Sequence, residues 1–279
     1  MRTVRHPLVM FVMAVLAVIG IGVIAVTAPK SPTIKSLAVM GTGIAGLPGV
    51  GADINPSIYE VATPPLGVRY YHTVGTYPQV RGSRPSQYSS ANSALKRAVL
   101  LDEHAFAVAA RKNAYRGKPP APGLYETPTD RKLTAVSNLV ASTLIPTVEE
   151  FLMSEPDEGW IAVTVLLSTG RDISPASVLF RNEGLAMLSV AQRVQRSALS
   201  RYQCLPRPDN LAKGQLEQAF EPSSGNYRFI TLLKSGLSVG FAAGEVGSIG
   251  CGRIQVTVPF NVLRPYLSLR GTRLVASFS

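Results

Sequence analysis

Ser238 lies in the segment 236–240 (GLSVG), which matches the GxSxG pattern around the nucleophile of serine hydrolases. In that chemistry a histidine removes the serine proton and an acid orients the histidine, in the chain order serine, acid, histidine. No histidine follows Ser238, and its surroundings predict a strand instead of the strand-turn-helix that the motif requires. We therefore predict that Ser238 is an ordinary strand residue and that the chain has no catalytic residue. A secreted hydrolase acting on lipid or acyl esters is the alternative.

Two pairs of adjacent acids, Glu149-Glu150 and Asp157-Glu158, are of the residue type that glycoside hydrolysis requires. Both pairs lie in or beside the acidic stretch 154–159 (SEPDEG), which predicts an exposed connector between two strands. We predict that these four carboxylates are solvated loop charges.

Asp102, Glu103 and His104 are consecutive in a predicted helix. Neighbours in a helix point about 100° apart, so these side chains do not converge on one substrate, and we predict a solvated face. Neither His104 nor His72 has a cysteine nearby, so the sequence predicts no metal site.

Residues 41–46 (GTGIAG) match the dinucleotide fingerprint GxGxxG. That motif needs a helix that begins at the loop and holds the pyrophosphate at its N-terminus. Pro48, Gly49 and Gly51 would break such a helix in its first turns. We predict no cofactor.

Cys204 and Cys251 are the only two cysteines in the chain. If they lie in an oxidising compartment, a disulfide is the natural expectation, and it would close a loop of about 48 residues. Two buried free thiols are the alternative.

Residues 8–28 contain no charged or amide side chain, and a helix of this length spans roughly 31 Å, about the thickness of a bilayer core. Arg2 and Arg5 precede this segment and no acid occurs before Asp53, which predicts a cytoplasmic tail at 1–7 and export of the chain from residue 29 onward. We expect a single-pass membrane protein with its C-terminal domain outside the cytoplasm. The alternative is a cleaved signal peptide and a secreted protein, although Pro29 would come directly after the cleavage site.

The exported part is basic. The chain carries a formal charge of +11, of which the two cytoplasmic arginines supply two, leaving +9 outside. Such a surface attracts anionic lipids, acidic polymers or acidic proteins, with solubility alone as the alternative. Nucleic acid is not expected, because no run of basic residues is interleaved with aromatics. Clustering beside a proline-rich loop makes four residues candidate basic contacts: Arg111, Lys112, Arg116 and Lys118.

The chain after the apolar segment divides by composition into a Gly/Pro-rich linker at 29–66 and a domain at 67–279, with halves at 67–156 and 157–279. Helical periodicity predicts two amphipathic helices, and alternating or continuous apolar runs predict the strands. The helices are expected at about 89–110 and 183–202, and the strands at 67–80, 133–144, 160–167, 227–233, 237–242, 253–260 and 273–278. The order predicts an α+β fold in which an antiparallel sheet packs against the two helices.

Several stretches together resemble an extracytoplasmic domain of unknown function. This domain is shared by RsiV-type anti-sigma factor ectodomains and a mycobacterial secreted immunogenic antigen. The stretches that carry the resemblance are 76–80 (TYPQV), 165–173 (VLLSTGRDI), 178–180 (VLF), 226–229 (NYRF), 235–241 (SGLSVGF), 245–247 (EVG), 250–252 (GCG) and 256–260 (VTVPF). The resemblance implies a β-rich α+β ectodomain and no established catalytic residue.

Two departures limit what the resemblance implies. Residues 1–7 are too few to hold a sigma factor, so the anti-sigma role is not expected. A domain of charge +9 would also repel a cationic lysozyme, which disfavours lysozyme as the partner. We therefore expect a membrane-anchored envelope binding or interaction protein of unknown ligand, with a structural envelope component as a further alternative.

Overall fold

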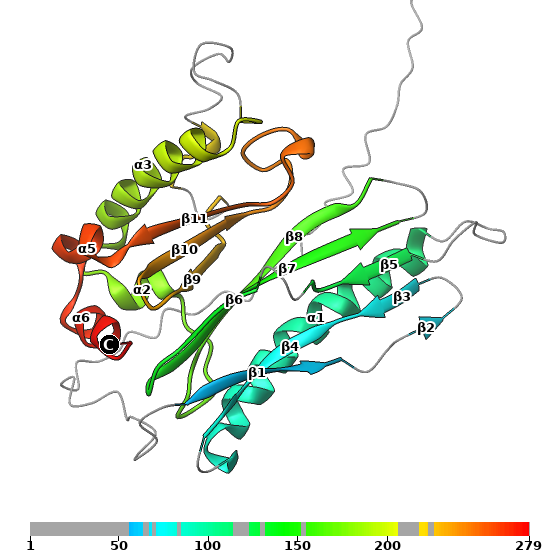
Figure 1. The fold of residues 1–279 in the computed structure, drawn as a ribbon, viewed down its shortest axis with the longest axis horizontal. Helices are drawn as coiled ribbons and strands as arrows, with labels where there is room; N and C mark the ends of the chain where they lie inside the picture. Colours follow the sequence, from blue (N-terminus) through cyan, green and yellow to red (C-terminus); the bar gives the residue numbers. More distant parts are fainter. Residues whose placement is uncertain are drawn as a thin grey trace, which may run out of the picture. The chain divides into compact units, whose positions relative to one another are not determined.

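The computed structural model describes residues 56–63, 67–68, 71–82, 85–113, 123–128, 132–151, 155–205, 218–222 and 226–278 (Figure 1). All of them belong to the unit Ile44–Ser279. The predicted cytoplasmic tail, the membrane segment at 8–28 and most of the predicted linker lie outside these ranges. Within the ranges just given, no helix combines the length and apolarity needed to cross a membrane.

A six-stranded mixed sheet forms one part of the domain. Its strands lie in the order β2 (Gly67–Val68), β3 (Tyr71–Val74), β5 (Gly123–Glu126), β7 (Val140–Glu150) and β6 (Leu133–Val136), with β8 (Asp157–Leu166) on the other edge of β7. Only β3 and β5 pair in parallel. The β7–β8 hairpin is paired continuously from Val140↔Leu166 to Glu149↔Asp157 and forms the spine of the sheet.

Two smaller sheets account for the other strands of the described residues. β1 (Ser57–Ala62) pairs antiparallel with β4 (Thr76–Arg81) along the full length of both strands. β9 (Phe229–Leu232), β10 (Gly236–Phe241) and β11 (Ile254–Pro259) form an antiparallel sheet with β10 in the middle. β1 therefore extends the folded domain into the range that composition predicted to be linker.

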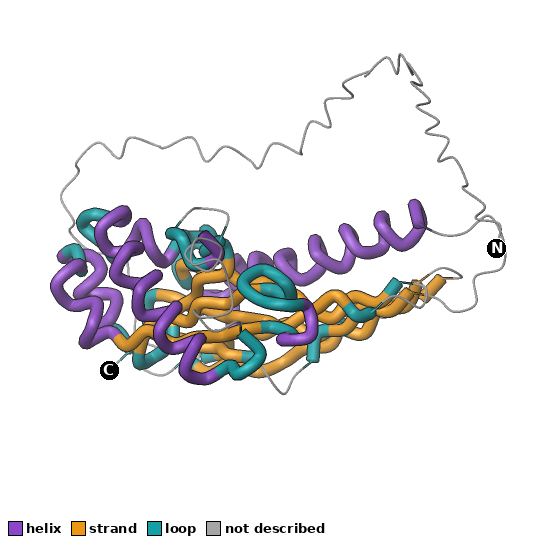
Figure 2. The backbone as a smooth tube through the Cα atoms, turned by 90° about the horizontal axis from the view of Figure 1, so that it is seen from above, coloured by secondary structure: helices purple, strands orange, loops and turns teal. Residues whose placement is uncertain are grey.

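The long helix α1 (Ser89–Asn113) follows the short 3-10 helix η1 (Pro85–Tyr88) and runs alongside the strands, as Figures 1 and 2 show. Its apolar residues recur at helical spacing, so one side can be buried against a sheet. Leu95 and Ala91 pack with Val163 and Val165 of β8, and Val99 packs with Ile145 of β7. The predicted first helix is confirmed.

The second long helix, α3 (Glu183–Arg201), covers the three-stranded sheet. Its N-terminus is capped by Asn182, whose side-chain oxygen accepts a hydrogen bond from the Leu185 N–H at 3.1 Å. The shorter helices of this half are α2 (Pro175–Leu179), η2 (Ile249–Cys251), α5 (Phe260–Leu263), η3 (Arg264–Tyr266) and α6 (Leu269–Ala276).

Buried polar contacts join the two larger sheets. The Ser142 hydroxyl lies 2.6 Å from that of Thr164 and accepts a hydrogen bond from the Leu232 N–H at 2.7 Å, which links the β7–β8 hairpin to β9. The Trp160 indole donates to the Phe241 carbonyl at 3.0 Å, which links β8 to β10. These hydrogen bonds give partners to polar hydroxyl, N–H and carbonyl groups that are shielded from water.

The α+β class and the two amphipathic helices are as predicted, but several local predictions were wrong. The range 133–144 holds β6 and the first part of β7, which form a hairpin where a single strand was expected, and the parallel pairing of β3 with β5 departs from the expected antiparallel sheet. The range 273–278 was predicted as a strand and instead lies mostly in α6, whose N-terminus is capped by Ser268 through a 2.8 Å bond from the Gly271 N–H.

Candidate anion-binding surface

Helix α1 has two faces of different chemistry. The side that faces the strands carries the buried residues Leu95, Val99 and Phe106. The opposite side carries a row of exposed residues three or four positions apart, which places them along one line of the helix surface. We call this row the α1 stripe, and its members are Arg97, Leu101, His104, Val108 and Lys112.

Both acids of α1 turn away from this stripe, which corrects the prediction of a solvated acidic face. The Asp102 carboxylate accepts a hydrogen bond from the Tyr125 hydroxyl of β5 at 2.9 Å. Glu103 is fully buried beside Thr63 and Gly75, so close that a Cβ on Gly75 would lie 2.4 Å from its Oε1. The stripe therefore carries basic and apolar side chains and no carboxylate.

Burial raises the pKa of three acids on the inner side of α1 and on the strand below it. Burial raises the pKa of Asp102, and the hydrogen bond from Tyr125 offsets part of this increase. Burial also raises the pKa of Glu103; the charge of Asp102 adds to the increase, and the Thr63 hydroxyl opposes it. Burial and the charges of Asp102 and Asp157 raise the pKa of Glu149 to about 7. Burial thus makes each of these groups easier to protonate than a solvated acid.

The acid pairs of β7 and β8 do not lie in a connector. Glu149 and Glu150 end β7, Asp157 and Glu158 begin β8, and Glu149 stands directly opposite Asp157 in the ladder. The prediction of loop charges was therefore wrong, because the hairpin continues to the edge of the acidic stretch. Since Glu149 also pairs with Tyr125 of β5, the register gathers Asp102, Tyr125 and Glu149 at one place.

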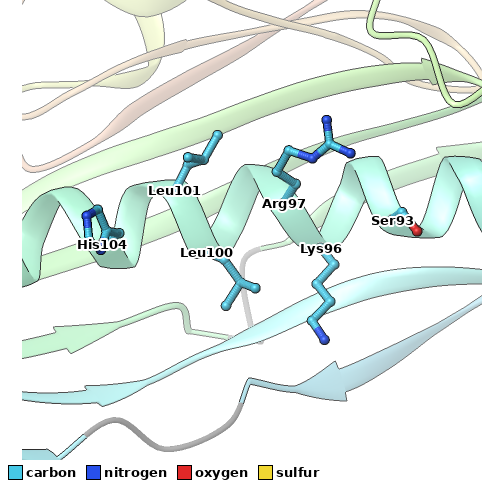
Figure 3. A pocket seen from close by; sticks show the side chains of 6 residues that line it. All are labelled: Ser93, Lys96, Arg97, Leu100, Leu101 and His104. Carbon is cyan, nitrogen blue, oxygen red and sulfur yellow. The ribbon is translucent and has the colours of Figure 1, made fainter.

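The exposed side chains of the stripe are large and apolar at its centre. Leu101 is 62% exposed and Val108 is 50% exposed. A shallow hollow lies on this helix, and Figure 3 shows four of its lining side chains, with Arg97 and Leu101 projecting on one side and Lys96 and Leu100 on the other. The Lys96 ammonium lies 5.8 Å from the centre of the Tyr77 ring, a cation–π arrangement that holds this side chain near β4.

Of the predicted basic contacts, Arg111 and Lys112 are exposed in the last turn of α1, and Arg116 and Lys118 lie outside the described residues. Arg111 donates a hydrogen bond to the Tyr71 hydroxyl at 3.0 Å and stacks over the same ring at 5.4 Å. Arg97, Leu101 and Val108 were not singled out from the sequence, although their spacing to Lys112 was the available signal.

Ser238 lies inside β10, as the strand prediction required, and is fully buried. Its hydroxyl accepts a hydrogen bond from the Gln255 side-chain amide at 2.9 Å, and Gln255 also donates to Thr257 at 3.2 Å. The GLSVG segment thus forms a ladder strand, without the sharp turn into a helix that exposes a hydrolase nucleophile. Over the described ranges, no group of three or more histidines, cysteines and acids is placed to hold a metal ion.

The predicted disulfide is present between Cys204 and Cys251, with 5.5 Å between their Cα atoms. It joins the segment after α3 to η2, next to Leu205 and Gly247. The bond therefore joins two segments of the C-terminal half of the domain.

No protein-family model and no curated protein sequence matches this chain. A solved structure of a DUF3298 family protein from Bacteroides fragilis is similar over 82% of this chain and 99% of its own, with a TM-score of 0.55 and 7% sequence identity. The two chains share a fold. A DUF3298 protein from Pseudomonas aeruginosa matches over 80% of this chain and 98% of its own, with a TM-score of 0.47 and 9% identity. The fold shared with the Bacteroides fragilis protein is thus that of a domain of unknown function.

Proposed function

We propose that this protein is a membrane-anchored, extracytoplasmic binding protein of the cell envelope, and that the α1 stripe engages an anionic partner without turning it over. One observation carries the proposal: α1 exposes Arg97, His104 and Lys112 in line with two large apolar side chains, while both of its acids face the sheet. An ordinary solvated helix face mixes both signs of charge, whereas this one presents a single sign.

The dimensions of the stripe suit an extended ligand. From Arg97 to Lys112 the helix advances about 22 Å, since each residue adds about 1.5 Å. Positive groups spread over that distance interact with a row of negative groups more strongly than with a single ion. An anionic polymer or an anionic surface fits this description better than a small molecule does.

The location is proposed from the sequence. Residues 8–28 are long and apolar enough for a membrane span, and the preceding arginines favour a cytoplasmic N-terminus. The resemblance to RsiV-type ectodomains and to the mycobacterial antigen supports an extracytoplasmic domain. The net charge of the exported part agrees with an anionic partner and disfavours a cationic one such as lysozyme.

Binding to a soluble polyanion tests the proposal. Full-length protein in a non-ionic detergent would be titrated with fluorescent poly-glutamate at low and at moderate salt. The variant Arg97→Glu/Lys112→Glu is expected to bind roughly tenfold or more weakly at low salt and to show a smaller salt dependence.

The matched control is Arg193→Glu/Arg196→Glu on the exposed side of α3, which makes the same change in net charge. If both double variants lost the same affinity, net charge alone would explain the binding and α1 would not be the site. Absence of measurable binding by the wild-type protein would overturn the proposal itself.

A further inference from the structure

We infer that the occupant of the α1 stripe is an anionic lipid surface, on which α1 lies parallel to the membrane with Leu101 and Val108 among the head groups. The inference rests on the proposed function and names the class of partner.

The apolar residues of the stripe distinguish a lipid surface from a soluble polyanion. Leu101 and Val108 are seven positions apart, two helical turns along the same line, and each exposes half or more of its surface. Arg97 and Lys112 flank them. Helices that lie in a membrane interface show this pattern, with apolar side chains at the acyl boundary and basic ones at the phosphates.

The point at which the chain enters the domain favours the same occupant. β1 begins at Ser57, which pairs with Arg81 at the end of β4, four residues before the start of η1. Ile58 packs against the cluster that contains Ala91 and Leu95 of α1. The chain coming from the predicted membrane span therefore reaches the domain beside the first turns of α1.

The length of that connection permits docking on the same membrane. The predicted span ends at Ala28, and residues 29–56 lead to β1. At about 3.3–3.6 Å per residue, a connection of about 28 residues can reach no farther than roughly 100 Å. Tethering at this distance gives the membrane surface a high effective concentration at α1, so even weak contacts would be populated.

A second copy of the chain is a less suitable occupant. Two α1 stripes facing one another would bring Arg97 and Lys112 of one copy toward like charges of the other, with no carboxylate on either stripe to compensate. Charge therefore favours a lipid surface over self-association.

The experiment places a fluorophore on the stripe of the full-length protein. Both native cysteines form the disulfide, so Leu101→Cys offers a single thiol for an environment-sensitive dye. The control is Leu185→Cys on α3, because Leu185 is 57% exposed and closely matches Leu101. Each labelled protein would be reconstituted in vesicles of phosphatidylcholine alone or with about 30 mol% phosphatidylglycerol, a typical anionic content.

The expected result is a blue shift at position 101 in the anionic vesicles, with quenching by lipid-borne quenchers at least about twofold stronger than at position 185. The shift should diminish with salt and in the Arg97→Glu/Lys112→Glu background. No shift at position 101, or equal shifts at both positions, would overturn the inference. Poly-glutamate binding that persists without such a shift would leave the proposed function in place and exclude the lipid.

Discussion

Tyr125 donates a hydrogen bond to the Asp102 carboxylate over 2.9 Å, and so ties α1 to β5 beneath the basic stripe. Burial of the two groups raises the pKa of both, and Asp102 adds to the shift of Tyr125. Glu149, opposite Tyr125 in the ladder, belongs to the same cluster. The contact holds one of the two acids of α1 away from the outer face, and burial beside Thr63 and Gly75 keeps the other, Glu103, away from it.

Stability should rise as the pH falls through the range in which this cluster takes up protons. Glu149 has a folded-state pKa of about 7 against an ordinary value of 4.5, so the folded domain binds more protons than the unfolded chain between these values. Its contribution is complete below about pH 4.5 and is lost as the pH rises through 7. The pKa values of Asp102 and Glu103 move in the same direction. Urea unfolding from pH 4.5 to 8 would measure the trend.

Glu149→Gln should flatten this dependence, because the neutral amide removes the titrating group. The control is Glu155→Gln, an exposed acid in the connector before β8. Equal pH slopes for wild type and Glu149→Gln would show that Glu149 does not titrate differently in the folded state.

Arg253→Met should lower the free energy of unfolding by roughly 2–4 kcal/mol. Arg253 is buried, donates to the Thr147 carbonyl at 2.5 Å, lies 3.6 Å from a Glu158 carboxylate oxygen and stacks over Trp160 at 5.5 Å. The substitution removes all three contacts and leaves the Thr147 carbonyl without this donor. Arg253→Lys keeps the charge and should cost less. Chemical denaturation would compare the two, and a Met variant as stable as wild type would contradict this account.

Tyr202→Phe should cost roughly 1–2 kcal/mol of stability and expose a sheet edge. The Tyr202 hydroxyl donates to the Gln255 carbonyl at 3.0 Å and accepts from the Gln255 N–H at 3.1 Å, which occupies both backbone groups of that residue on the free side of β11. Denaturation and light scattering on gentle heating would detect the two effects. Ser200→Ala, a nearby exposed site on α3, is the control and should leave both unchanged.

Cys204→Ser/Cys251→Ser should destabilise the domain by up to about 4 kcal/mol, because the bond closes a loop with a sequence separation of 47 residues. Wild-type protein unfolded with and without reductant should show a similar difference, whereas the double variant should be insensitive to reductant. A stability that does not depend on reductant in the wild type would mean that the disulfide adds nothing to the folded state.

The local sequence pattern was sufficient to predict the helices and strands whose apolar residues recur with a strong period. The helices at α1 and α3, the strand at β8 and the placement of Ser238 in a strand follow from the spacing of apolar residues, because burial of one face imposes a period of 3.6 or 2. The disulfide followed from counting cysteines in a chain predicted to be exported. The charge of the part predicted to be exported, and with it the predicted sign of a partner, also comes from composition alone.

Only the tertiary structure decided which way the charged residues point. Glu103 stands at helical spacing with the buried residues Val99 and Phe106, but an acid at such a position is ordinarily expected to reach solvent. The inward direction of Asp102 and Glu103 depends on Tyr125, Thr63 and Gly75, which are distant in sequence. Likewise, the register of β5, β7 and β8 brings Glu149 opposite both Tyr125 and Asp157. Contacts between residues that are distant in sequence decide which side of α1 the two acids occupy. The sequence alone therefore did not predict the basic stripe.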